Sequence, residues 1–181
     1  AWQLGRTPGM ALTAVCDRDP TAARKAIAAY ASADSKGGNV PIYSDREFLS
    51  ADSKYDVLVE ATNSIGFASQ ACELAIRSGK HVVLMNAEVD LALGPWLHPL
   101  AVEHGVVMTS DAGDQHGVLL RMIDEIRLWD FRIVMAGNIK GFLNRYATAK
   151  SLEYEARIRR LNPIQCCAYT DGTKLNVEMA L

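Results

Sequence analysis

The amino-acid sequence predicts an α/β fold built on a doubly wound parallel sheet, and three observations support this prediction. Short apolar runs recur at residues 11–16, 40–43, 56–60, 81–85 and 106–109, and each has the length of a strand. The helices predicted between them have about 10–15 residues, as in strand–helix–strand units. Each run is followed by polar residues, as expected at the carboxyl edge of a parallel sheet. Helices should therefore cover both faces of the sheet.

Helices and strands are expected to alternate as far as residue 109. The first elements predicted are a helix end and loop at 2–9, a strand at 11–16, a helix at 20–30 that ends before 36–39, and a short strand at 40–43. A helix capped by Ser44 and Asp45, with Glu47 in its first turn, and a strand at 56–60 follow. The last elements of this part are a helix that ends at Ser78 and Gly79, a strand at 81–85, a helix at 95–104 and a strand at 106–109. The run at 56–60 does not alternate, so we expect its strand to be buried on both faces.

Beyond Ser110 the pattern changes, which indicates a second, α+β region. Residues 115–129 have the periodicity of an amphipathic helix. Residues 131–136 have the pattern of a strand that runs into a glycine-flanked loop at 137–141, and a further helix is expected from Asp171.

Asp17 directly follows the first apolar strand and points to a dinucleotide. A carboxylate at the tip of the second strand of a Rossmann-like sheet accepts hydrogen bonds from the ribose hydroxyls of the adenosine half. This favours NAD, whereas the guanidinium of Arg18 is suited to the 2′-phosphate of NADP, so the sequence leaves NADP or NAD open. Ala61, Thr62 and Asn86 follow later strands at the same expected edge and complete the candidate cofactor site.

The first strand and glycine-rich turn that should precede such an aspartate are missing from the sequence, which opens at Ala1. We therefore expect a fragment whose sheet lacks its first strand, with the G-x-G-x-x-G turn upstream. Because that turn approaches the pyrophosphate, the fragment alone should bind cofactor weakly and be inactive. Residues 1–110 are assigned to a dinucleotide-binding domain truncated at its N-terminus, and 111–181 to the beginning of a catalytic domain truncated at its C-terminus.

Composition narrows the class of partner. A net charge of −2 provides no broad basic surface, so we expect no nucleic-acid partner. The sequence has no apolar run near the ~20 residues that cross a bilayer, and no signal-peptide pattern, so we expect no membrane partner and a cytoplasmic location. The four cysteines lack the spacing of a zinc or redox motif, which indicates structural thiols in a reducing compartment.

Three motifs in the second half of the chain resemble one enzyme family. They are Ser110–Gly117, Ala136–Gly141 and Tyr169–Leu175. The order of the strands and of the residues that follow them in the first half fits the same family. Together they resemble homoserine dehydrogenase and its relatives, most closely a group of predicted homoserine dehydrogenases that commonly end in a SAF domain and include deoxyxylulose phosphate reductoisomerase-like enzymes. The resemblance implies an NAD(P)-dependent oxidoreductase that interconverts an alcohol and a carbonyl on a small polar or phosphorylated substrate. We also expect a homo-oligomer.

The same resemblance implies catalytic residues. The family carries a catalytic aspartate and lysine four positions apart at the start of a helix, and here Asp171 and Lys174 lie three apart. Positions i and i+3 share a helix face, so Lys174 is expected to exchange a proton with the reacting oxygen. On periodicity alone, these residues and Glu178 also fit an exposed helical stripe. Asp114 and Lys140 complete the catalytic candidates, although Lys140, between two glycines, fits a cleft and a surface turn equally well.

Two alternatives remain open from the sequence. The family has Asn-Lys where this chain has Asn86–Ala87, so the substrate need not be an amino acid. Asp111, Asp114 and Glu88 all follow strands, and three carboxylates would suit the divalent cation of a metal-dependent reductoisomerase, although the assignment preferred here has no metal. A non-catalytic dinucleotide sensor is the other alternative. His116 is interpreted as a solvated residue at a helix start rather than as a general base.

Overall fold

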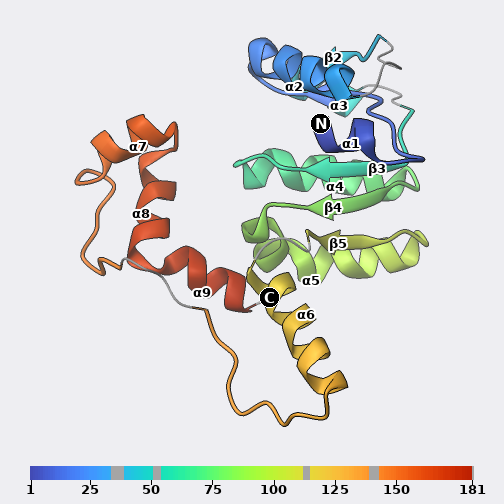
Figure 1. Cartoon of the computed structure of the whole chain (residues 1–181). Coiled ribbons are helices and arrows are strands. Elements are labelled where there is room, and N and C mark those ends of the chain that lie inside the picture. Colours follow the sequence, from blue (N-terminus) through green and yellow to red (C-terminus); the bar gives the residue numbers. More distant parts are fainter. Residues whose placement is uncertain (34–38, 51–53, 112–114, 139–142, 181) are drawn as a thin grey trace. The chain divides into compact units, whose positions relative to one another are not determined.

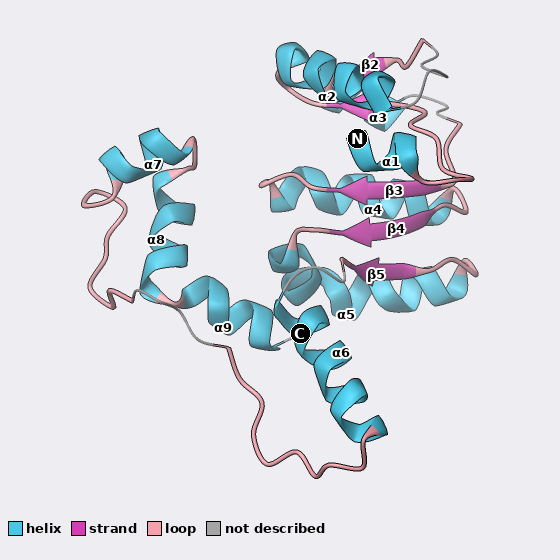
Figure 2. Cartoon of the chain, in the orientation of Figure 1, coloured by secondary structure: helices cyan, strands magenta, loops and turns pink. Residues whose placement is uncertain are grey.

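The computed structural model describes residues 1–33, 39–50, 54–111, 115–138 and 143–180, which form two compact units. The first unit contains Ala1–Val83 and Trp96–Met108, and the second contains Leu84–Pro95 and Thr109–Leu181. Figure 1 shows the elements in chain order, and Figure 2 shows that the described part of the chain after β5 is helix and loop.

A pair of short parallel strands forms one edge of the first unit. β1 (Val15–Cys16) pairs with β2 (Ile42–Tyr43) so that Cys16 lies opposite Tyr43. Between them in the chain lies α2 (Pro20–Ala33), which contacts both β1 and the short helix α1 (Trp2–Arg6). Both strands are shorter than the apolar runs that predicted them.

The next helix, α3 (Asp45–Ser50), begins as its sequence predicts. The Glu47 carboxylate accepts hydrogen bonds from the backbone N–H of Ser44 (2.8 Å) and from its hydroxyl (2.7 Å). These bonds favour the ionised form and hold the pKa of Glu47 below its usual range. The arrangement satisfies a donor that the helix itself leaves unpaired, and so fixes where α3 starts.

Three further strands form a second parallel sheet in the order β3-β4-β5. They are β3 (Val57–Glu60), β4 (His81–Leu84) and β5 (Met108–Ser110). The bonds between β4 and β5 advance in the same direction along both strands, because the Val82 N–H donates to the Val107 carbonyl (2.9 Å) and the Asp111 N–H to the Leu84 carbonyl (2.9 Å). Their arrows run the same way in Figure 2. The predicted parallel α/β class is confirmed.

The described strands form two separate sheets, because β1 and β3 do not pair with each other. The prediction that β3 is buried on both faces is wrong, because Val57 and Val59 are 46% and 51% exposed. The reason is that α4 (Ile65–Arg77) packs on β3, whose other face is open in the described residues.

The core of the first unit centres on α4. Ser64 caps this helix by accepting a hydrogen bond from the Phe67 N–H (3.3 Å), and Gly79, at φ +71°, turns the chain after it as predicted. Small side chains on its buried face let the backbone approach its neighbours closely, so that branched residues fill the remaining space. The buried residues are Ala68, Ala71, Cys72, Ala75, Ile76, Val82, Leu97 and Ala101.

The helix predicted at 95–104 starts eight positions earlier, because α5 spans Ala87–Glu103. The Val89 N–H donates to the Asn86 carbonyl (3.1 Å), and Glu88 and Asp90 place negative charge in the first turn, where the helix dipole favours it. Pro95 was expected in the first turn and instead lies inside the helix. It lacks the N–H for one backbone hydrogen bond, and the helix nevertheless continues to Glu103.

The described part of the second unit after Ser110 contains α6 (Gln115–Leu128), α7 (Glu153–Arg159), α8 (Pro163–Asp171) and α9 (Thr173–Ala180). The strand predicted at 131–136 is wrong: these residues have no regular structure. Val134 and Met135 are 84% and 87% exposed. No described strand pairs with this run, and an apolar pattern without a partner strand cannot form a ladder.

Candidate functional site

Lys174 lies at the centre of the candidate site in the second unit. Its side chain is only 12% exposed, and Nζ donates to Glu88 Oε1 at 3.3 Å. Glu88 lies in the first turn of α5, shortly after β4 ends, and its side chain is 41% exposed. A largely buried ammonium is held in this way beside a partly solvated carboxylate, at the carboxyl end of a parallel strand.

A backbone turn directs Lys174 to that position. Gly172, at φ +92°, ends α8 in the left-handed conformation that glycine adopts most easily. A Cβ at this position would lie 3.2 Å from Leu143 Cδ1. Asp171 is therefore the last residue of α8, whereas Lys174 lies in α9. The expectation that the two share one helix face is wrong, because the turn at Gly172 separates them.

Asp171 braces this turn. Its Oδ1 accepts a hydrogen bond from the Thr173 backbone N–H at 2.8 Å, and this bond holds the pKa of Asp171 below its usual range. The Cys167 thiol lies 3.8 Å from Asp171 Oδ2 and donates to the Ala147 carbonyl at 3.2 Å. Partial burial, followed by the nearby carboxylate, raises the pKa of Cys167. A thiol held protonated in this way fits the structural role predicted for it.

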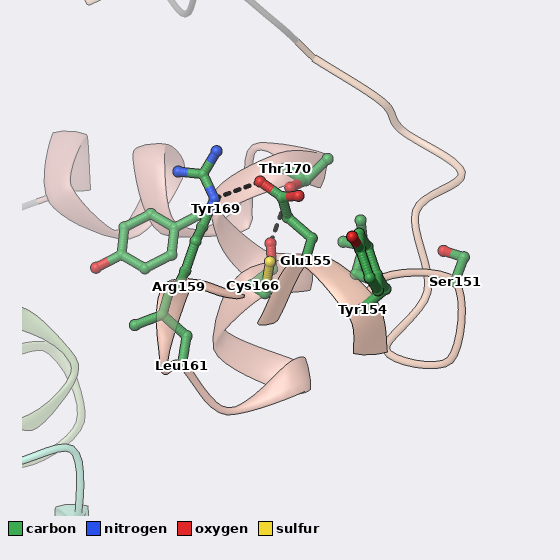
Figure 3. Close-up of a pocket in the computed structure, with 9 residues that line it drawn as sticks. Ser151, Tyr154, Glu155, Arg159, Leu161, Cys166, Tyr169 and Thr170 are labelled. Carbon is green, nitrogen blue, oxygen red and sulfur yellow. Dashed lines mark hydrogen bonds and ion pairs between the residues drawn. The ribbon is translucent and has the colours of Figure 1, made fainter. Parts of the chain in front are cut away.

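Tyr169 connects Lys174 to a pocket. The ammonium lies 5.7 Å from the centre of the Tyr169 ring, within the range of a cation–π contact. Tyr169 lies on α8 and also helps to line a pocket of about 460 Å³, most of whose lining residues lie on α7 and α8 (Figure 3). Glu155 and Arg159 form an ion pair at its wall (2.6 Å). The other lining residues are Ser151, Leu152, Tyr154, Leu161, Cys166 and Thr170.

Ser110 and His116 form a second polar pair in this unit. Ser110 Oγ and His116 Nε2 lie 2.8 Å apart, which connects the end of β5 to the start of α6. His116 Nδ1 is buried and has no hydrogen-bond partner among the described residues. The side chain is half-buried, so its interpretation as a solvated residue is wrong. The sequence feature that could have predicted this pair is a serine before, and a histidine after, the same strand-to-helix loop.

Some expected residues are not brought together. The carboxylate of Glu88, a possible metal ligand, is paired with Lys174. Within the part of the chain that the structure describes, no group of three His, Cys, Asp or Glu side chains is arranged to hold a metal ion. Asp114 and Lys140 lie outside the described residues. Asn86 is 5% exposed and begins the turn into α5.

The candidate cofactor residues of the first unit begin at the carboxyl ends of β1 and β2. Asp17 follows β1, and its N–H donates to the Tyr43 carbonyl (3.1 Å). Its Oδ1 accepts a hydrogen bond from the Asp19 N–H at 2.8 Å. Arg18 Nε lies 3.9 Å from Asp45 Oδ2, and this arginine side chain is 72% exposed. Sequence reasoning identified Asp17 and Arg18 but missed Asp45, which contacts Arg18 only because β1 and β2 pair.

Glu60 adds a buried acid at the end of β3. The residue is 3% exposed, and its Oε1 accepts a hydrogen bond from the Thr62 N–H (2.8 Å). Oε2 is buried without a hydrogen-bond partner among the described residues. Burial raises the pKa of Glu60, and the bond from Thr62 opposes this effect. Ala61 beside it is exposed, and Thr62 is half-buried.

Asp17 places a carboxylate at the carboxyl end of β1, the edge at which ligands bind in parallel α/β sheets. No helix in the described ranges has the length and apolar character needed to span a bilayer.

Comparison with known proteins agrees with this assignment. The family model described as homoserine dehydrogenase, NAD binding domain, matches residues 3–109. A second model, described as oxidoreductase DRL, catalytic domain, matches residues 113–181. A search of curated proteins found no match. The two models identify an NAD(P)-dependent oxidoreductase. Since the first model covers more than half of the chain, this protein belongs to the family of homoserine dehydrogenase NAD-binding domains.

Proposed function

We propose that this oxidoreductase interconverts a CH–OH group and a carbonyl on a small polar or phosphorylated substrate, with Lys174 as its proton-transfer residue. The observation that supports this proposal is the Lys174–Glu88 contact: an ammonium that is largely removed from solvent, 3.3 Å from a carboxylate, beside the end of a parallel strand. In α/β enzymes ligands bind at these strand ends.

The contacts of Lys174 suit a proton donor. The Glu88 carboxylate and the face of the Tyr169 ring both stabilise the positive charge of the ammonium. In the reducing direction, Lys174 Nζ gives a proton to the carbonyl oxygen as the carbonyl carbon gains hydride. In the oxidising direction, the neutral amine takes the hydroxyl proton as the carbon loses hydride. Charge and protons then balance in both directions.

The cofactor supplies the hydride acceptor or donor. Asp17 would accept hydrogen bonds from the ribose hydroxyls, and Arg18, Ala61, Thr62 and Asn86 are proposed to complete the surroundings of the cofactor. Asp171 is proposed to hold the turn at Gly172, and thereby Lys174, in place through its bond to Thr173 (2.8 Å). This makes Asp171 a positioning residue rather than a group on the reacting atoms.

An enzyme is favoured over a sensor by the match to an oxidoreductase catalytic domain at residues 113–181. Pairing with Lys174 is favoured over metal binding as the role of Glu88, because its carboxylate lies 3.3 Å from the ammonium. A cation at this carboxylate would have to displace Lys174.

The test is NAD(P)H-linked turnover of the full-length protein across a panel of small aldehydes, ketones and keto acids, each with and without a phosphate. For any substrate that wild type reduces, Lys174→Ala is expected to lower the rate by about a hundredfold or more, because positioned proton transfer typically contributes 10²–10⁴-fold. Cofactor affinity should change little.

Two controls separate chemistry from folding. Lys174→Met keeps the apolar stem of this mostly buried side chain and should lose the same activity while retaining the circular dichroism spectrum of wild type. Lys150→Ala removes an exposed lysine of the same unit and should leave turnover unchanged. Turnover within a few-fold of wild type in Lys174→Met would overturn the role of Lys174.

A further inference from the structure

Asp45 is placed beside the candidate adenosine-binding residues by strand pairing. β1 and β2 run parallel with Cys16 opposite Tyr43, so both strands end at the same edge. Asp17 follows β1 directly, and Asp45 is the first residue of α3, shortly after β2. Nothing in the local sequence connects Asp45 with Arg18, but their side chains lie 3.9 Å apart.

Arg18 is the residue that would recognise NADP. NADP differs from NAD by a 2′-phosphate on the adenosine ribose, and a guanidinium near that ribose is the usual group that binds it. In this chain the guanidinium faces a carboxylate instead. The pair is loose and the Arg18 side chain is 72% exposed, so a ligand can displace it. Asp45 would then lie beside the phosphate with its charge uncompensated.

The surroundings add further negative charge. Asp17 lies next to Arg18, Asp19 caps α2 through the Thr21 N–H (2.8 Å), and Glu47 is held in α3 by Ser44. Burial is the main cause that raises the pKa of the neighbouring Cys16 thiol to about 11, and Asp45, Asp17 and Glu47 add to it. Several carboxylates therefore lie near Cys16 and Arg18, and like charge disfavours a further anion beside them.

We propose that Asp45 is a specificity-determining residue of the cofactor site: its pairing with Arg18 makes the protein select NAD over NADP. The proposal rests on the family assignment and on the adenosine ribose lying at Asp17. Asp17 attracts the free ribose hydroxyls of NAD, and Asp45 disfavours the phosphate that would replace one of them.

The experiment is a fluorescence titration of the full-length protein with NADH and with NADPH. Wild type should bind NADH more tightly. Asp45→Asn keeps the size of the side chain and leaves Arg18 without its carboxylate, so its NADPH affinity should rise by about tenfold, the effect of one charge-assisted contact. Its NADH affinity should stay within about twofold of wild type. Arg18→Ala in the Asp45→Asn background should abolish the gain.

Asp56→Asn is the matched control, because it removes an exposed carboxylate of the same unit at the amino end of β3. It should not change the ratio of the two affinities. Wild type that prefers NADPH, an unchanged NADPH affinity in Asp45→Asn, or binding of neither dinucleotide would each overturn the proposal. These readouts involve binding only, so a failure of the Lys174 mechanism, which is seen in turnover, is distinguished from a failure here.

Discussion

Three carboxylates of the first unit and the central lysine of the second find their partners over different distances along the chain. In the first unit, Asp17, Glu47 and Glu60 each accept hydrogen bonds from a residue two or three positions away. In the second unit, Lys174 reaches Glu88 across 86 positions, and it does so through a turn at Gly172. The first kind of contact forms wherever the local sequence allows it. The second kind exists only if the fold of the unit is correct.

Replacement of Gly172 should have the largest effect, because the long-range contact of Lys174 depends on the turn at this residue. We expect Gly172→Ala to lower the free energy of unfolding by about 1–3 kcal/mol, because a side chain at φ +92° is strained and its Cβ would press on Leu143. The measurement is urea denaturation. The turnover of Gly172→Ala should also fall, since Lys174 follows this turn.

Gly66→Ala is the matched control in the first unit. Gly66 lies in the first turn of α4, where an alanine Cβ would meet open space and the backbone has no positive φ, so alanine should stabilise the helix by roughly 0.5–1 kcal/mol. If both substitutions changed stability by the same amount and sign, the turn at Gly172 would not be a constraint.

A smaller effect is expected from Glu88→Gln. This change leaves the mostly buried Lys174 ammonium without its carboxylate, which costs about 1–2 kcal/mol after allowance for the partial exposure of Glu88. The measurement is again the free energy of unfolding in urea, together with the rate of carbonyl reduction.

The exposed pair Arg77–Glu73 in α4 provides the control. Its partners are four positions apart, and Glu73→Gln should cost less than about 0.5 kcal/mol. Equal losses for Glu88→Gln and Glu73→Gln would show that the long-range pair is no stronger than a surface pair, and would weaken the case for a desolvated Lys174.

Much of the fold was predictable because its signals are local. The strands at 57–60 and 81–84, and the cap at Ser44, follow from apolar runs and capping chemistry within a few residues. The prediction of a strand at 131–136 was wrong because a strand also needs a partner strand, which the sequence pattern of one segment does not reveal. The predicted start of α5 was wrong because Pro95 is typical of a first helical turn, whereas here it lies inside the helix.

The candidate site shows the same division. The identity of Lys174 followed from a motif, and the acid after β1 followed from the strand–acid–helix pattern. The partners of Lys174 and Arg18 did not, because Glu88 and Asp45 approach them through strand pairing and helix packing. Asp171 was assigned to the wrong helix, since Gly172 fits a helix interior in a periodicity pattern although its backbone breaks the helix.

The smallest effect is expected at Glu60, where the contact is local but buried. Burial raises the pKa of this carboxyl above its value of 4.5 in a solvated reference, while the Thr62 bond limits the rise. An acid whose pKa is higher in the folded state contributes stability that is fully present below the unfolded pKa and is lost as the pH rises through the folded pKa. The free energy of unfolding should therefore decrease as the pH rises from about 4.5.

Glu60→Gln removes this titration and keeps an oxygen that can accept the Thr62 N–H bond. The variant should lose that part of the pH dependence and gain stability over wild type towards neutral pH. Urea denaturation at a series of pH values measures it, with Glu103→Gln, an exposed carboxylate of the same unit, as the control. If wild type and Glu60→Gln showed the same dependence on pH, the unpartnered Oε2 would be solvated in the folded protein. The contrast between local and long-range contacts would then hold without any role for burial in the first unit.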